Sequence, residues 1–500
     1  MRSPVTALPL LLVVLLAGTL LAAQQPGGVP REPIESHPHD LESSYLRMPL
    51  PAGAERYAQL DGERMKGFLR EIVAVSERSR SDGELLWGRI AGTAYDDMVE
   101  GVVQRQFEEF GLKGIERQYF DLPPQWFPTA WAFTATSGGR TLRFETARAA
   151  TRSAATPPGG LDLEPVWVGL GTEADFAGRD VRGKLVLIQS MPMPGVVSHS
   201  ASHLGAAARA VEKGAAAIAL NVAIPGNMQV QTGPGNTKVA TFTIGTEDMT
   251  RLRQEVERGS VRVHVALSTE QRTGLRDASV WGTLPGTTDE NIIIMAHHDA
   301  YFQGAMDNAS GMAVMLGLAE HYAARPAAER RRTLRFVTTS GHHAGSMGTA
   351  WLHANRDSAL RGTVLAINCE HVSVTQAYFD RNAPVLRRSD NIDARRWWVH
   401  GSRRLANLAL ESWRMFGVTL YDTMENNASG DMRAMDRDVP SIQLIESAVY
   451  YHSDHDTPEV VPAAGLEAVA RAYARIIDQV NTLSKDALLP APVRGSAGQE

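Results

Sequence analysis

The stretch from Asn291 to Gly311 restricts the possible folds of this 500-residue chain more than any other segment. An apolar run, Ile292 to Ala296, is followed by a His-His-Asp sequence at 297–299, and a glycine-containing turn then leads through Asp307 to a predicted helix start. This order is typical of an α/β sheet that presents ligands at the carboxyl ends of its strands. We therefore expect His297 to be a metal ligand, Asp299 to hydrogen-bond its other ring nitrogen, and Asp307 to bridge two ions.

The chain after residue 290 alternates short apolar runs with longer helical patterns. Strands are predicted at 333–339, 363–367 and 442–445, and helices at 311–323, through 351–352, near 393–416 and at 463–483. Upstream, helices are predicted at about 60–75 and from Asp96-Asp97 to about 110, followed by a strand at 114–120. This alternation predicts an α/β fold with a mostly parallel, mixed sheet and helices on both faces.

Between residues 128 and 268 the pattern changes to short β-type runs, broken by one alanine-rich helix from Ala201 to Lys213. The order of Asp180 to Ile188, this helix and Gly214 to Ile218 resembles the protease-associated (PA) domain. Such domains usually cover the active-site mouth of a hydrolase or bind its substrate. We predict a PA-like insert at 128–268 within a discontinuous larger domain at 44–127 and 269–484. A generic small α/β or β domain is the alternative.

The two ends of the chain carry their own signals. Arg2 precedes an apolar run from Ala7 to Ala23, which is the pattern of a secretory signal peptide, although an uncleaved membrane anchor is the alternative. We expect an exported protein, periplasmic or secreted, with a signal peptide at 1–23, a flexible lead-in at 24–43 and a disordered tail at 485–500. The only cysteine, Cys369, excludes an intrachain disulfide.

Composition narrows the class of partner. A formal net charge of −6 gives no reason to expect nucleic acid as a partner. No segment after the signal peptide is long and apolar enough for stable membrane insertion. The sequence does not determine the oligomeric state.

Groups of His, Asp and Glu follow the predicted strands at their carboxyl ends. They are His297 to Asp307, His342-His343, Glu370-His371 and His452 to Asp456. A lone histidine after a strand is more often a structural, hydrogen-bonded residue than a ligand. Four such groups at equivalent strand ends together predict a metal site.

The order and spacing of these groups resemble peptidase family M28, which contains zinc aminopeptidases, glutamate carboxypeptidase-like enzymes and relatives of glutaminyl cyclase. The resemblance runs from Leu86–Thr93, similar to the family's substrate-side loop, through 297–299 and Gly304–Gly311 to Tyr451–Pro458. It implies one or two zinc ions and a peptide or small amide substrate. The metal ligands it implies are His297, Asp307, His343, Glu370 and His452, with His455 as the alternative to His452. Residues expected to bind substrate are Tyr301, Asn308 and Asp431.

The chain departs from this family at His342-His343, where the family has a glutamate base followed by a glutamate ligand. We expect His343 to ligate through a ring nitrogen, although the site then carries one negative charge less. His342 is suited to general base catalysis at neutral pH, and Asp299 is the other residue that we expect to be catalytic. Alternatively, His342 is an additional metal ligand, or its ring blocks the position of the water molecule.

Three functions therefore stay open at the level of sequence. The first is an exported zinc-dependent exopeptidase that acts on short peptides. The second is a pseudopeptidase that binds without cutting, and the third is a cyclase or amidohydrolase.

Overall fold

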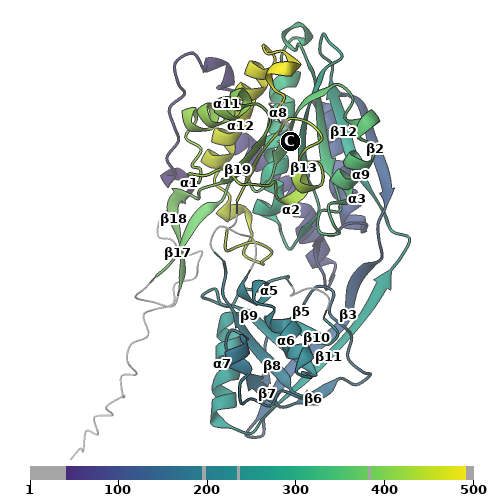
Figure 1. Cartoon of the computed structure of the whole chain (residues 1–500), viewed down its shortest axis with the longest axis vertical. Coiled ribbons are helices and arrows are strands. Elements are labelled where there is room, and N and C mark those ends of the chain that lie inside the picture. Colours follow the sequence, from purple (N-terminus) through teal and green to yellow (C-terminus); the bar gives the residue numbers. More distant parts are fainter. Residues whose placement is uncertain (1–40, 194–198, 233–236, 381–384, 447, 491–500) are drawn as a thin grey trace, which may run out of the picture.

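The computed structural model describes residues 41–193, 199–232, 237–380, 385–446 and 448–490, and Figure 1 shows two lobes. The predicted signal peptide, most of the predicted lead-in and the last ten residues lie outside the described residues. The upper lobe is built on a seven-stranded sheet, and the lower lobe contains the strands of residues 125–272. Within the described ranges, none of the helices combines the length and apolarity that a membrane span requires.

The seven-stranded sheet has the order β19-β20-β16-β13-β15-β12-β2. Its four central strands, β13, β15, β16 and β20, run parallel, whereas β2, β12 and β19 pair antiparallel at the edges. The sheet is thus mixed with a parallel centre, and the predicted fold class is confirmed. The strand bounds are β2 Lys113–Asp121, β12 Arg276–Leu284, β13 Asn291–His297, β15 Thr333–Thr339, β16 Thr363–Cys369, β19 Arg396–His400 and β20 Ser441–Ile445.

The sheet separates two apolar layers because successive strand residues point to opposite faces. Ile292 and Ile294 of β13 pack on one face under the long helices, whereas Ile293 and Met295 pack on the other. Both faces of β13 are fully buried, which explains its continuous apolar sequence. The helices of the first face are α2 Gly62–Ser81, α3 Ala94–Glu109, α8 Gly311–Ala323, α11 Arg403–Met415 and α12 Ala463–Val480, and those of the second are α9 Met347–Ala354 and α10 Arg356–Ala359.

The lower lobe consists of a four-stranded and a five-stranded sheet that enclose a second core. The four-stranded sheet has the order β4-β3-β11-β6 and the five-stranded sheet the order β5-β10-β9-β8-β7. Long strands β3 and β11 pair over 12 residues and connect this lobe to the upper one (Figure 1). The bounds are β3 Gln125–Ser137, β4 Arg140–Arg143, β5 Arg148–Ala149, β6 Leu161–Leu163, β7 Pro165–Trp167, β8 Leu185–Ser190, β9 Ala217–Val222, β10 Ala240–Thr243, β11 Val261–Arg272, α4 Glu173–Phe176 and α7 Thr246–Arg258.

Three predictions of local structure were wrong. The expected helix 201–213 is divided into α5 Ser200–His203 and α6 Ala206–Glu212, because Gly205 adopts a left-handed conformation with φ 63°. The expected helix 393–416 begins only at Arg403, since residues 396–400 pair with β20 as a strand. Leu488 is fully buried and its carbonyl accepts from Ser402 N at 2.9 Å, so the predicted disordered tail starts too early. The remaining elements are α1 Leu41–Ser44, β1 Gly88–Arg89, β14 Ala300–Tyr301, β17 Thr375–Phe379 and β18 Leu386–Ile392.

Candidate metal centre

The parallel strands bring the predicted ligands to one edge of the sheet. His297 is the last residue of β13, and β15 and β16 end three and one residues before His342 and Glu370, respectively. Because β13 lies between β15 and β16, the three strand ends are neighbours. Asp307 follows in the turn before α8, and His452 comes from the loop after β20.

Three of these side chains converge on one point. His343 Nε2 and His452 Nε2 lie 2.9 Å apart, and they are 3.4 and 3.1 Å from Asp307 Oδ2. His452 adopts a left-handed backbone with φ 54°, a strained conformation that turns its ring toward this point. Two imidazole nitrogens and one carboxylate oxygen form a set of ligand atoms within 4.8 Å of one another.

A second set of ligand atoms lies next to the first. His297, Glu370 and His371 offer atoms within 4.8 Å of one another, and His297 Nε2 lies 3.3 Å from Asp307 Oδ1. Asp307 thus reaches both sets, one with each carboxylate oxygen, as a bridging ligand does. His371 was not singled out as a ligand in the sequence, although it was noted beside Glu370.

The unpaired atoms of this group test whether a metal fits. Among the described residues, His297 Nε2 and Asp307 Oδ2 are buried and make no hydrogen bond, although other ring nitrogens lie close to Asp307 Oδ2. Such atoms cost free energy unless something satisfies them, and a metal between the two sets would do so. Histidine nitrogens with carboxylate oxygens are a donor set that zinc accepts, so the residues fit this metal.

Asp299 orients the site differently from the prediction. Its backbone carbonyl, not its carboxylate, accepts from His297 Nδ1 at 3.1 Å, whereas the nearest carboxylate oxygen is 3.8 Å away. The carboxylate instead accepts from His343 Nδ1 at 2.9 Å and from the backbone N–H groups of His342 and His343 at 3.0 Å. The reason is that an imidazole at position 343 offers an N–H donor. Asp299 thereby leaves His343 Nε2 free to face Asp307.

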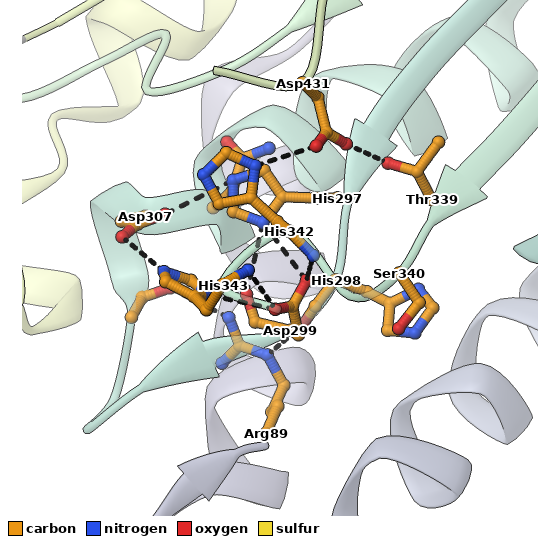
Figure 2. Close-up of polar contacts among 12 residues, drawn as sticks. Arg89, His297, His298, Asp299, Asp307, Thr339, Ser340, His342, His343 and Asp431 are labelled. Carbon is orange, nitrogen blue, oxygen red and sulfur yellow. Dashed lines mark hydrogen bonds and ion pairs between the residues drawn. The ribbon is translucent and has the colours of Figure 1, made fainter. Parts of the chain in front are cut away.

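His342 lies above His297 and is held by Asp431. The two imidazole rings stack at 3.9 Å between centroids, and His342 Nδ1 lies 2.8 Å from Asp431 Oδ1 (Figure 2). The other oxygen of Asp431 accepts from the Thr339 hydroxyl. Burial lowers the pKa of His342, but the Asp431 carboxylate outweighs burial and raises it to about 9. His342 Nε2 is left free and lies 4.0 Å from Glu370 Oε1.

Glu370 is held in place by three hydrogen bonds to Oε2, from Asn368 Nδ2, Gln443 Nε2 and Asp431 N. Gly430 packs against the same carboxylate so closely that an added Cβ would overlap Glu370 Oε1. The loop before β20 thus fixes both His342 and Glu370.

Two residues predicted to bind substrate have other positions. Asn308 is fully buried, donates to Cys369 O at 3.0 Å and accepts from His371 N at 3.0 Å, so it ties the turn before α8 to the end of β16. Asp431 is 1% exposed and contacts His342 instead of a cavity. Tyr301, in contrast, lines both cavities beside the metal centre.

The cavities lie between the two lobes. The larger one, of about 490 Å³, is lined by Tyr301, Asp299 and His343 together with Trp126 and Arg152 of the lower lobe. The smaller one, of about 240 Å³, shares Tyr301, His343 and Arg152 and also reaches His342 and His452. The lower lobe therefore forms one wall of the space in front of the metal centre.

Hydrogen bonds between the two lobes hold that wall against the site. Gln231 N donates to His452 O at 2.8 Å, and Asp454 N donates to Gln229 O at 3.1 Å. Arg148 of the lower lobe donates to Leu85 O at 2.8 Å. The loop that carries His452 is thus fixed by both lobes.

Two further residues support the site and were missed in the sequence. Asp456 accepts from the backbone N–H groups of Met306 and Asp307 at 2.6 and 3.1 Å, which fixes the turn that carries Asp307. Arg89 is fully buried and donates to the carbonyl oxygens of His298 and Gly304. Both lie within segments that the sequence had marked for other reasons, but no local signal distinguishes them.

Comparisons with known proteins agree with this geometry. Residues 279–477 match the model of peptidase family M28. The alkaline phosphatase isozyme conversion protein of Escherichia coli (strain K12) is 34% identical over 113 residues, which are 19% of this chain and 32% of that protein. The match thus spans about a third of the length of that relative.

Solved structures share the fold at low identity. A peptidase M28 precursor from Shewanella amazonensis SB2B is similar with a TM-score of 0.67 and 19% identity, over 88% of this chain and 98% of that one. A zinc aminopeptidase from Bacillus subtilis has a TM-score of 0.61 and 18% identity, over 88% of this chain and 99% of that one. An aminopeptidase from Aneurinibacillus sp. strain AM-1 has a TM-score of 0.56 and 21% identity, over 88% of this chain and 97% of that one. His297, Asp307, His343, Glu370 and His452 all lie within residues 279–477, the part of this chain that matches peptidase family M28.

Proposed function

We propose that this protein is an exported, zinc-dependent exopeptidase that removes residues from the ends of short peptides. The observation that carries the proposal is the convergence of His343, His452 and Asp307, with Asp307 also reaching the set that contains His297 and Glu370. The match of residues 279–477 to the model of peptidase family M28 supports a metallopeptidase, and one solved neighbour is described as a zinc aminopeptidase.

The residues around the metal centre supply the proton transfer. Zinc bound there would activate a water molecule and polarise the scissile carbonyl group. His342 gives its Nδ1 proton to the hydrogen bond with Asp431, so Nε2 is the atom that takes a proton from water and returns it to the leaving amine. Nε2 can do so only in the neutral ring, which bound zinc would favour by lowering the raised pKa of His342. Asp299 holds the backbone of His342 and His343, so the base and the ligand keep their relative position.

The free amino end is the first candidate for recognition, because two of the solved structures with this fold are described as aminopeptidases. Recognition of the carboxyl end is the second candidate. It is favoured by Arg152, an exposed cation that lines both cavities and matches a substrate carboxylate. We also propose that residues 128–268 act as a PA domain that shapes this mouth, since Thr151 and Arg152 border the larger cavity.

The experiment compares three versions of one tripeptide: free at both ends, N-acetylated and C-amidated. Purified protein is assayed before and after EDTA treatment and after zinc is added back, with His452→Ala as the metal-site variant. An aminopeptidase cleaves the amidated peptide but not the acetylated one, and a carboxypeptidase does the reverse. Arg152→Gln then raises KM only if the carboxyl end is recognised.

Other outcomes select the alternatives. Stoichiometric zinc without cleavage of any peptide identifies a peptide-binding protein, and in that case His342→Glu with His343→Glu creates activity. Release of ammonia or ring closure without peptide cleavage identifies an amidohydrolase or cyclase. Export is tested by fractionation and by N-terminal sequencing, which is expected to begin near residue 24.

A further inference from the structure

A second group of potential ligands lies behind the metal centre. Asp96, Glu100, Asp277 and His298 offer ligand atoms that all lie within 4.8 Å of one another, and each residue is at most 3% exposed. None of the four lines either cavity in front of the metal centre. We propose that this group is a separate structural site for one divalent transition-metal cation, Zn²⁺ or Mn²⁺.

The fold explains why these residues meet. Asp96 and Glu100 are four residues apart on α3 and therefore share one helix face. Asp277 belongs to β12, the strand next to β15. His298 directly follows His297, so its side chain points to the opposite side of the extended chain. In Figure 2, His298 lies with Ser340 on the far side of the labelled group from Asp307.

The histidine is aimed into the group but has no hydrogen-bond partner in the described part of the chain. His298 is fully buried, and neither of its ring nitrogens makes a hydrogen bond to any residue that the structure describes. Its Nε2 lies 3.2 Å from Asp96 Oδ1, which is also unpartnered, and 4.0 Å from Glu100 Oε1. Buried polar atoms without partners are rare and costly, and a cation between these three atoms satisfies them together.

The remaining contacts hold the carboxylates in place. Asp96 Oδ2 accepts from Gly92 N at 3.2 Å, and Glu100 Oε1 accepts from Ala278 N at 3.2 Å. The Ser340 hydroxyl donates to Asp277. Carboxylates fixed by backbone and hydroxyl donors provide a site that is formed before a cation arrives.

The charge of the group matches a dication. Three ionised carboxylates carry three negative charges. Arg117 Nη1 pairs with Glu100 Oε2 at 2.9 Å and also with the exposed Asp97, so it offsets at most one of these charges and leaves at least two. The nearby Arg89 uses its guanidinium on carbonyl oxygens and on the Ser76 hydroxyl. Two uncompensated negative charges in a buried space are unstable, and one divalent cation neutralises them.

The pKa values of the carboxyls support this reading. Burial raises the pKa of Asp96 and of Glu100 to about 7 and that of Asp277 to about 9, and repulsion among the three carboxylates adds to the effect of burial. Without a cation the group therefore retains protons near neutral pH. A mixed set of one imidazole and three carboxylates suits Zn²⁺ and Mn²⁺, because softer metals prefer sulfur ligands and Ca²⁺ prefers oxygen alone.

Selective chelation tests the site. The full-length chain is produced in medium with added Zn²⁺ and Mn²⁺, dialysed against EDTA in the native state and analysed by inductively coupled plasma mass spectrometry. His343 and His452 are partly exposed, so EDTA reaches them, whereas the four residues of the buried group are shielded. We expect about one equivalent of metal to remain.

Variants locate that equivalent. Asp307→Ala, which removes the bridging ligand of the metal centre, is expected to keep it, whereas Asp277→Asn is expected to lose it. Asp121→Asn is the matched control, because Asp121 lies on the neighbouring strand β2 and its side chain is 90% exposed. If Asp277→Asn does not fold by circular dichroism, Asp96→Asn takes its place.

Two results overturn the proposal. One is the absence of retained Zn²⁺ or Mn²⁺ in Asp307→Ala, which would make the group a set of carboxyls that share protons. The other is an unchanged equivalent in folded Asp277→Asn. Peptidase activity of the same preparations tests the proposed function separately. It depends on the metal centre that contains Asp307, and it does not depend on the buried metal that resists EDTA.

Discussion

Asp431 offers a direct test of how His342 acts. Asp431→Asn removes one negative charge and changes little else in shape. Charge-assisted hydrogen bonds contribute about 1.5–3 kcal/mol and neutral ones about 0.5–1.5 kcal/mol, so the hold on His342 weakens by about 1–2 kcal/mol. An asparagine amide that donates to His342 Nδ1 would also force the ring proton onto Nε2, the atom proposed to act as the base. General base catalysis is worth about 10²- to 10⁴-fold, so we expect kcat to fall by about 10²-fold or more.

The assay is steady-state hydrolysis of the preferred peptide by the zinc-loaded enzyme. KM is expected to stay within about twofold, because Asp431 is buried and contacts no cavity. A control comes from Asp438→Asn: Asp438 pairs with His353 Nδ1 at the same distance of 2.8 Å, but that ring is half exposed and lies outside the metal centre. This control is expected to leave kcat unchanged.

A double-mutant cycle separates positioning from stability. If Asp431 acts through His342, Asp431→Asn has no further effect on kcat in a His342→Gln background. Equal losses in both backgrounds, or a kcat that stays at the wild-type level, would refute the reasoning. If only KM rises, Asp431 contacts the substrate, as the sequence predicted.

Three other outcomes are expected. Gly430→Ala should lower metal content and activity although it changes no ligand, because the new Cβ displaces Glu370; metal analysis that shows full occupancy would contradict this. Burial and the nearby Arg325 lower the pKa of His321 to about 3, so this ring contributes stability that is present above its ordinary pKa and is lost as pH falls below it. Between pH 6.5 and 5 the loss amounts to about 2 kcal/mol, which urea unfolding should show for the wild type but not for His321→Gln, with the half-exposed His353→Gln behaving as wild type. EDTA should lower Tm, because zinc at 100 times its Kd stabilises each site by about 2.7 kcal/mol; an unchanged Tm after confirmed metal removal would exclude a stabilising metal centre.

Periodicity in the sequence was sufficient for most elements of the upper lobe. The predicted helix 311–323 and strand 333–339 have the same bounds in the structure, since their apolar patterns and end signals lie within the segments themselves. The alanine-rich run around Gly205 wrongly predicted one continuous helix. A helix can contain a glycine in the right-handed conformation, but Gly205 is left-handed in the structure, and this conformation ends the helix.

The candidate ligands could also be predicted, since each follows a strand and carries a recognisable residue type. What the sequence did not determine is how they pair. Asp299 binds His343 across 44 residues, and Asp431 binds His342 across 89, so no local pattern encodes either contact. His371 reaches Asp307 across 64 residues for the same reason.

The sequence by itself determined the α/β architecture of the upper lobe and the residue types available for a metal. Only the tertiary structure decided that the lower lobe forms a wall of the cavities and that a His-Asp pair occupies the position of the expected glutamate base. It also gathered Asp96, Asp277 and His298 into one buried group. The physical reason is that helix and strand formation depend on near neighbours, whereas the position of a proton or a cation depends on charges that meet only after folding.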